Sequence, residues 1–385
     1  MNCQDGRRLG LSAICFTLRY GIIFAAIYVQ LYGFADAQVP GGAPPKLSAA
    51  ESLARSVEAS FRNDAALADV FFIDQANGWA VGDRGVIWHT ADGGATWREQ
   101  SSGVSCRLNC VFFLDARRGW AAGGEHRPLG RSTQGVLLQT TDGGTNWVAA
   151  QTATLPLLNR IKFFDPNVGV AVGAGFAAHP SGVFVTYDGG RDWQALPADK
   201  AGYWLAGDFL DAEAGAVAAS AGEFATIARQ RVQQSPLAMT SMRSTHAMRL
   251  LAPASGWLVG DGGLVMTTAD LGHTWQSALA ELPHDIAEDF DFHALAVHGG
   301  YVWIAGSPGS KVFCSADGGK GWQAFDTGQF VPIRALAFSD AQHGWAVGDL
   351  GTILATHDGG QTWQRQRAGG SRAALLALFP AARDV

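Results

Sequence analysis

Six copies of an eight-residue segment place an aspartate in the same local setting along the chain. The segments are TADGGATW (90–97), TTDGGTNW (140–147), TYDGGRDW (186–193), TADLGHTW (268–275), SADGGKGW (315–322) and THDGGQTW (356–363). Carboxylates at a defined separation could act as acid and nucleophile in glycoside hydrolysis. A catalytic acid needs one special environment, however, and these six share the same one. We therefore interpret the aspartates as structural, each accepting hydrogen bonds from the backbone of its own turn.

Each segment also ends in a tryptophan, whose large flat side chain is expected to pack between neighbouring repeats. The structural positions that the repeat predicts are Asp92, Trp97, Asp142, Trp147, Asp188, Trp193, Asp270, Trp275, Asp317, Trp322, Asp358 and Trp363.

Outside the repeats, the sequence shows no recognisable catalytic or metal-binding pattern. The acidic run HDIAEDFDFH (284–293) is interpreted as a solvated loop. No nucleophile–base pair, phosphate-binding loop or zinc spacing is present, so we predict no catalytic, cofactor or metal residues and no cofactor. Cys106 and Cys110 are close enough to form a disulfide, although we favour buried free thiols for these two and Cys314.

The eight-residue segment ends a longer repeat that occurs seven times. Its second landmark is usually Gly-Trp, at Gly78-Trp79, Gly119-Trp120, Gly169-Val170, Gly215-Ala216, Gly256-Trp257, Val302-Trp303 and Gly344-Trp345. The fourth repeat, which begins near Tyr203, has lost the eight-residue segment. Each repeat holds four short β segments punctuated by turn residues. The sequence thus predicts an all-β fold, a seven-bladed β-propeller of four-stranded blades over 65–367.

Short extensions flank the predicted propeller. Arg7, Arg8, the apolar run at 20–34 and ADA at 35–37 indicate a signal peptide over 1–37, and hence export with no stable membrane span after cleavage. Residues 38–64 form a linker and N-terminal extension, in which Leu53, Val57 and Phe61 favour a short helix packed on the propeller. An outer strand that joins the last blade is the alternative. Residues 368–385 form a C-terminal extension, and their segment RAALLALFP (372–380) resembles an inner strand.

Binding is expected at a mouth of the central channel. Alignment of the repeats on the Gly-Trp landmark places Arg160, His246, His293 and Arg334 at the start of different inner strands, together with Asn109 and Asn159. These residues are our candidate partner-binding set, and ordinary solvated strand ends are the alternative. The formal net charge of −6 argues against nucleic acid as the partner. We expect a monomer that binds a protein.

The combination of F-x-D, G-W-A-V-G and T-x-D-G-G-x-T-W resembles the photosystem II stability/assembly factor family over roughly residues 65–367. The short segment alone is similar to the Asp-box, or bacterial neuraminidase repeat. The resemblance implies a non-enzymatic scaffold, exported to the thylakoid lumen or, in bacteria that do not photosynthesise, to the periplasm. It also implies a membrane-protein subunit or its exposed tail as partner. The alternative is a sialidase-like or other glycoside hydrolase, since sialidases carry Asp-boxes too.

Overall fold

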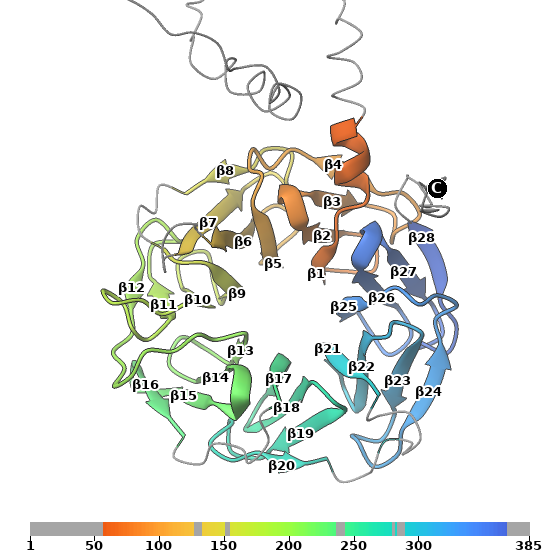
Figure 1. Cartoon of the computed structure of the whole chain (residues 1–385). Coiled ribbons are helices and arrows are strands. Elements are labelled where there is room, and N and C mark those ends of the chain that lie inside the picture. The colour runs from red at the N-terminus through yellow and green to blue at the C-terminus, as the bar shows by residue number, and fades with distance from the viewer. Residues whose placement is uncertain are drawn as a thin grey trace, which may run out of the picture. The chain divides into compact units, whose positions relative to one another are not determined.

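Seven four-stranded antiparallel sheets form a ring around a central channel in the computed structural model (Figure 1). The predicted seven-bladed β-propeller is therefore confirmed. The structure describes residues 57–126, 133–150, 155–235, 243–278, 282 and 289–367. The predicted signal peptide, the segment 372–380 and residues 284–288 of the acidic run lie outside these residues. The end of that run is not a loop, because residues 291–293 belong to a strand. Within them, no helix is long and apolar enough to span a membrane.

Each blade is one continuous stretch of chain whose strands follow in sequence order from the channel outward. Blade 1 comprises β1 (Leu67–Phe72), β2 (Gly78–Gly82), β3 (Ile87–Thr90) and β4 (Arg98–Gln100), and blade 2 comprises β5 (Arg107–Phe113), β6 (Gly119–His126), β7 (Thr133–Thr140) and β8 (Val148–Ala149). Blade 3 comprises β9 (Leu158–Phe163), β10 (Gly169–Gly173), β11 (Val183–Thr186) and β12 (Gln194–Ala195), and blade 4 comprises β13 (Ala206–Phe209), β14 (Gly215–Ala218), β15 (Phe224–Ala228) and β16 (Arg231–Gln234). Blades 5 to 7 comprise β17 (Thr245–Leu251), β18 (Ser255–Gly260), β19 (Leu264–Thr268) and β20 (Gln276–Ser277); β21 (Asp291–His298), β22 (Tyr301–Ser307), β23 (Lys311–Ser315) and β24 (Gln323–Asp326); β25 (Ile333–Phe338), β26 (Gly344–Gly348), β27 (Ile353–Thr356) and β28 (Gln364–Arg367).

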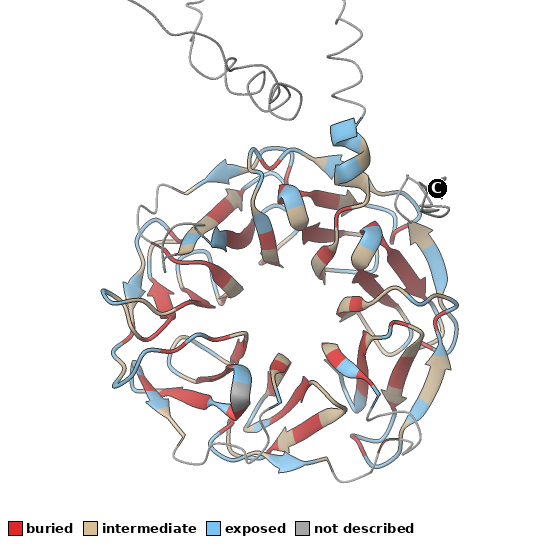
Figure 2. Ribbon diagram, in the orientation of Figure 1, coloured by how far each residue is buried: buried red, intermediate tan, exposed pale blue. Residues whose placement is uncertain are grey.

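The core lies between the faces of neighbouring blades. Four of the second strands, β2, β10, β14 and β26, are buried at every residue, and the other three are exposed only at their ends. Strands buried on both faces need a continuous apolar run, which these sequences supply. The fourth strands, such as β4 and β20, are mostly exposed, and Figure 2 shows this change from the inside of the ring outward.

The repeated eight-residue segment forms the turn between the third and fourth strands, as predicted. In blade 1 the Thr90 hydroxyl accepts a hydrogen bond from Gly94 N (2.8 Å) and donates one to Asp92 Oδ1 (2.8 Å). Asp92 also accepts bonds from the hydroxyl and backbone N–H of Thr96, which lower its pKa to about 2. Gly94 has φ +97°, which glycine adopts without strain.

The segment's first residue carries a role that the sequence analysis missed. None of the six aspartates is buried, whereas the Ser or Thr two positions earlier is buried in all six copies. Its hydroxyl links the buried glycine N–H to the aspartate, so the buried end of each turn depends on that hydroxyl.

An interblade aromatic unit joins neighbouring blades. The Trp of the Gly-Trp landmark stacks on the Phe that ends the next blade's inner strand, and that Phe meets the next blade's segment Trp edge-on. In the 7-to-1 unit the Trp345 and Phe72 ring centroids lie 3.5 Å apart, Phe72 meets Trp97 at 83°, and Trp345 Nε1 donates to Gly93 O (2.8 Å). Such ring pairs contribute about 0.5–1.5 kcal/mol beyond their buried area.

The complete unit occurs at four of the seven blade interfaces: 7-to-1, 1-to-2, 2-to-3 and 6-to-7. At the last three, the landmark Trp stacks on the Phe of the next blade, in the pairs Trp79–Phe113, Trp120–Phe163 and Trp303–Phe338. The indole N–H groups of these three Trp residues donate to the carbonyls of Gly143, Gly189 and Gly359, respectively. Val170 and Ala216 replace the landmark Trp in blades 3 and 4. In blade 4, whose segment was predicted to be lost, a tight turn at Arg229 and Gln230 (φ +51° and +57°) joins β15 to β16.

The described part of the predicted N-terminal helix, residues 57–63, is helical. Its contacts differ from the expected ones, because Val57 and Phe61 are exposed. Polar groups hold it instead: Arg62 pairs with Glu99 (2.6 Å), and Arg367 of β28 donates to Asn63 O (3.1 Å). Closure by an outer strand is not seen in the described residues, since β28 already fills that position in blade 7.

Cys106, Cys110 and Cys314 are free thiols in the structure. Cys110 is buried, and burial raises its pKa. Burial also raises the pKa of Cys314, to about 11.

The buried hydroxyl of the repeated turn can be tested at Thr186, which is 1% exposed. Thr186→Val keeps the shape of the side chain but leaves the buried Gly190 N–H without its acceptor. We expect a loss of ~1–3 kcal/mol in the free energy of unfolding, measured by denaturant titration. Thr186→Ser keeps the hydroxyl and is the matched control. Equal stability of the Val variant and the wild type would contradict the role of the hydroxyl.

Candidate functional site

The inner strands of six blades begin with a β-bulge, which turns one extra residue out of the ladder. The bulged residues are Ala68, Asn109, Asn159, His246, His293 and Arg334. Three of the four candidate partner-binding residues therefore occupy equivalent positions at one mouth of the channel. Arg160, the fourth, follows a bulge and points into the channel.

The two asparagines at this mouth join blades together. Asn109 Nδ2 donates to Leu158 O of the next blade (2.8 Å), and Asn159 Nδ2 donates to Trp204 O of the one after (2.8 Å). Their polar atoms satisfy backbone carbonyls at strand ends, which is a structural role.

The histidines and Arg334 already have partners at the mouth. His246 Nε2 lies 2.5 Å from Asp261 Oδ1, and its ring packs against His293 with centroids 4.6 Å apart. Arg334 makes two hydrogen bonds to Asp349, both of 2.9 Å. Burial, with help from the neighbouring His246 and Arg334, lowers the pKa of His293 to about 4. His293 is therefore neutral at pH 7 and adds no positive charge there.

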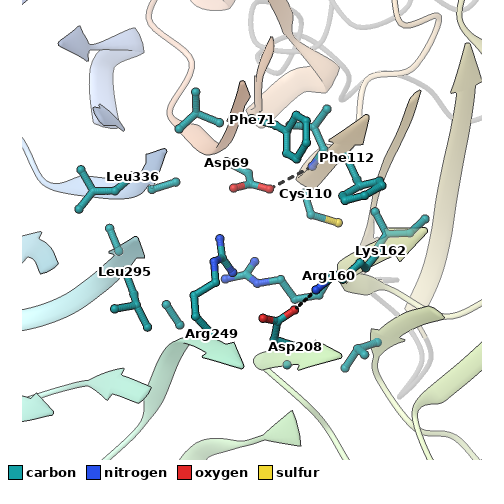
Figure 3. Close-up of a pocket in the computed structure, with 18 of the residues that line it drawn as sticks. Asp69, Phe71, Cys110, Phe112, Arg160, Lys162, Asp208, Arg249, Leu295 and Leu336 are labelled. Atoms are coloured by element: carbon teal, nitrogen blue, oxygen red, sulfur yellow. Dashed lines mark hydrogen bonds and ion pairs between the residues drawn. The ribbon is translucent and has the colours of Figure 1, made fainter. Parts of the chain in front are cut away.

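Below the mouth, the channel holds a cavity of about 310 Å³ that is lined by all seven inner strands (Figure 3). Four cationic side chains and two carboxylates face it: Arg160, Lys162, Arg249, Arg334, Asp69 and Asp208. Blades 6 and 7 contribute small or aliphatic side chains such as Ala294, Ala335 and Leu336. Apart from Arg334 of blade 7, the charged groups of the cavity therefore come from blades 1, 3, 4 and 5.

Both carboxylates bond to the blade that follows their own. Asp69 Oδ2 accepts from Val111 N (3.1 Å), and Asp208 Oδ2 accepts from Leu250 N (2.8 Å). Asp208 Oδ1 also accepts from Lys162 Nζ at 2.8 Å. Asp208 and Lys162 thus balance each other, as Asp349 balances Arg334.

Arg160 and Arg249 are the two arginines of the cavity that have unused donors and no carboxylate partner among the described residues. Arg160 donates from Nη1 to Asn159 O (2.9 Å) and from Nη2 to His246 O (3.0 Å), whereas Arg249 donates only from Nη1 to Met248 O (3.1 Å). Each guanidinium carries five N–H donors. No ion pair joins either arginine to a carboxylate among the described residues.

Figure 3 shows both arginine side chains extending into the channel, with Asp69 on the opposite wall. Burial among the strands raises the pKa of Asp69, and Arg160 opposes that rise most strongly. The cavity therefore has an excess of positive charge and free N–H donors that suit an anion. Where the structure describes side chains, no group of three His, Cys, Asp or Glu residues could hold a metal ion.

The sequence predicted the mouth and placed Arg249 near it along the chain, but it gave no role to Lys162 and Asp208 of the deeper site. Lys162 lies two residues beyond Arg160, on the same face of its strand. Asp208 and Arg249 occupy the equivalent position in blades 4 and 5. Because side chains on one face of a strand recur at every second residue, extending the alignment by two positions would have found them.

Asp69 makes the stability of the fold depend on pH. A raised folded-state pKa means that the folded state binds this proton more tightly than the unfolded chain, so the ionised carboxylate disfavours folding near neutral pH. This cost fades as the pH falls through the folded-state pKa.

Asp69→Asn, which keeps an oxygen for Val111 N, is therefore expected to raise Tm at pH 7 and to change it less at pH 4. Thermal unfolding at both pH values measures this. Asp208→Asn is the contrasting variant and should lower Tm at pH 7, because it leaves Lys162 without its carboxylate. A Tm for Asp69→Asn below that of the wild type at pH 7 would refute the assignment.

Comparison with known proteins identifies the family. The model of the family described as photosynthesis system II assembly factor YCF48 matches residues 49–231 and 225–336. The chain is 27% identical over 306 residues to the photosystem II assembly protein Ycf48 of Thermosynechococcus vestitus, covering 75% of this chain and 81% of that protein. It is 29% identical over 119 residues to the chloroplastic photosystem II stability/assembly factor HCF136 of Arabidopsis thaliana, covering 29% and 28% of the two chains.

Solved structures share the fold. The structure of YCF48 bound to D1 peptide matches with a TM-score of 0.61 and 24% identity, over 76% of this chain and 92% of that one. The GH74 xyloglucanase of Xanthomonas campestris matches with a TM-score of 0.62 and 14% identity, over 80% and 55% of the two chains. These likenesses describe the architecture alone, but the family model spans most of the blades, and the chain belongs to the Ycf48 family of photosystem II assembly factors.

Proposed function

We propose that this protein is an exported, non-enzymatic assembly factor whose channel binds an acidic segment or the free C-terminus of a membrane-protein subunit. The observation that carries the proposal is the convergence of Arg160 and Arg249, from blades 3 and 5, in a cavity where both retain unused donors. A guanidinium binds a carboxylate through two parallel hydrogen bonds, which gives both strength and orientation.

The size of the cavity supports a chain end as the ligand. About 310 Å³ lies at the lower limit of ordinary ligand pockets. A helix of 10–12 Å diameter would not fit among these side chains, whereas a terminal residue would. The solved relative bound to a D1 peptide supports a peptide as partner, since that protein shares this fold.

In this proposal the mouth residues act differently from one another. Arg160 is the only one of the four sequence candidates that keeps free donors and no carboxylate partner. His246, His293 and Arg334 shape the opening, and Arg249 replaces Arg334 as the second anion ligand. The aspartates and tryptophans of the repeated turns remain structural.

The glycoside hydrolase alternative has less support. The GH74 likeness concerns the fold, and hydrolysis requires an acid and a second carboxylate that are both available to substrate. Asp208 accepts bonds from Lys162, Phe209 N and Leu250 N, which occupy both of its oxygens. Asp69 is bonded to Val111 N and has two arginines as its nearest charged neighbours.

We extend the proposal to the organisation of the chain. Residues 1–37 direct export to the periplasm or thylakoid lumen, and residues 65–367 act as one binding domain between the extensions 38–64 and 368–385. The partner then meets the protein on the side of the membrane to which the signal directs it.

The proposal can be tested with two short peptides that both end in an acidic residue, one with a free α-carboxylate and one amidated. Fluorescence polarisation should show tighter binding of the free-acid peptide. Arg160→Gln and Arg249→Gln should each weaken that binding about tenfold or more, since a hydrogen bond to a charged group contributes ~1.5–3 kcal/mol.

Arg117→Ala, an exposed arginine in the turn between β5 and β6, is the matched control and should leave binding unchanged. Unchanged affinity in both channel variants, with melting curves like the wild type, would refute the channel site. Hydrolysis of xyloglucan or a sialoside by the purified protein would refute the non-enzymatic assignment.

A further inference from the structure

Leu350 has an unusual combination of exposure and backbone conformation. It is the middle residue of η3 (Asp349–Gly351), the turn between β26 and β27, with φ +54° and ψ +34°. Its side chain is 58% exposed. The equivalent residue is Arg84 in blade 1 and Gly262 in blade 5, with φ +59° in both. Such a turn favours glycine or asparagine, so leucine is strained there and also leaves apolar surface in water.

Two exposed phenylalanines lie next to this turn. Phe330, 82% exposed, precedes Pro332, whose carbonyl accepts from Asp349 N (3.1 Å). Phe61, 53% exposed, lies two residues before Asn63, and Arg367 bonds both Asn63 O (3.1 Å) and Gly351 O (2.8 Å). We call Phe61, Phe330 and Leu350 the apolar rim.

The apolar rim adjoins the mouth of the channel. Leu350 directly follows Asp349, which holds the cavity-lining Arg334 through two hydrogen bonds. Phe330 lies four residues before Arg334 in the segment that leads into β25. The start of β25 pairs with the end of β26, at Ile333 and Gly348, so the turn and the bulge share one end of the blade. Leu350 and Phe330 therefore lie at the end of blade 7 that carries Arg334, whereas Phe61 lies beside Arg62, which pairs with Glu99 of the outermost strand β4.

We propose that the apolar rim binds apolar side chains of the same peptide whose acidic end occupies the channel. This inference rests on the proposed function and adds to it the composition of the partner: aromatic or branched aliphatic residues upstream of an acidic chain end. A strained, exposed leucine beside an anion site is explained if a ligand covers it.

The charges around the rim favour a peptide over a lipid bilayer as its occupant. Asp349 borders Leu350, and Arg62 next to Phe61 is paired with Glu99. Asp83, in the equivalent turn of blade 1, is paired with Arg107 (3.1 Å). A surface that binds anionic lipid carries an excess of unpaired basic residues around its apolar groups. Here Arg62 and Arg107 are paired with carboxylates, and Arg84 lies over the Phe61 ring, 4.8 Å from its centroid.

The test uses two acid-ended peptides that differ upstream, one with leucine and phenylalanine and the other with serine at the same positions. Leu350→Gly recreates the Gly-Gly turn of blade 5, so its Tm should equal or exceed that of the wild type. Its affinity for the apolar peptide should nonetheless be about fivefold weaker, a loss of ~1 kcal/mol in binding free energy. Its affinity for the serine peptide should be unchanged. Phe330→Ser should behave likewise. Val148→Ser, on the outer strand β8, is the matched control for an exposed apolar residue and should change neither affinity.

Equal wild-type affinity for the two peptides, or unchanged binding by both rim variants, would overturn the rim. If Arg249→Gln still weakened the binding of both peptides in that case, the proposed function would stand without the apolar rim. Failure of the wild type to bind either peptide would overturn both. Loss of sedimentation with phosphatidylglycerol–phosphatidylcholine vesicles in the rim variants, with peptide binding intact, would assign the rim to lipid and overturn the proposal.

Discussion

Closure of the ring depends on side chains, because no strand between residues 57 and 367, where the structure describes them, is exchanged between the first and last blades. Trp345 of blade 7 stacks on Phe72 of blade 1 and donates to Gly93 O, across 252 residues of chain. The same aromatic unit joins blades 6, 7, 1, 2 and 3 in one arc. Only a closed ring brings seven inner strands to one axis, so the channel and its charges exist through these contacts.

The remaining interfaces lack the complete unit, and four of the six charged side chains of the channel come from the blades that form them. Arg160 and Lys162 come from blade 3, Asp208 from blade 4 and Arg249 from blade 5. Polar bonds join these blades, such as Lys162 to Asp208 and Asp208 to Leu250 N. Charged side chains thus supply both blade-to-blade contacts and the anion site. A change that removes one of them affects the two together, which is why each variant needs a measurement of folding beside one of binding.

The fold could be predicted from the sequence because its determinants repeat. Seven Gly-Trp landmarks and six turn segments define the number of blades and the place of each turn. The buried Ser or Thr of the turn was missed because an aspartate is the more conspicuous hydrogen-bonding residue, and burial cannot be read from the segment alone. The helix at 57–63 was found from its spacing, but its exposed Phe61 was not, since an amphipathic pattern does not say what covers the apolar face.

The candidate site was only half predictable for a related reason. Alignment of repeats brings residues to one mouth, but it does not show which of them are already engaged. Arg334 is bound by Asp349 and His293 is neutral, and both facts depend on contacts between segments far apart in sequence. Arg249 became prominent only when the strands were placed around one axis, where it lines the same cavity as Arg160.

We propose that this member of the Ycf48 family holds its partner in the channel. A crystal structure of the protein with an acid-ended peptide tests that claim most directly. The account predicts the terminal carboxylate within hydrogen-bonding distance of Arg160 and Arg249, with the peptide leaving through the mouth. A peptide bound to the outer strands or to the face that carries the repeated turns, with the cavity holding only water, would contradict it.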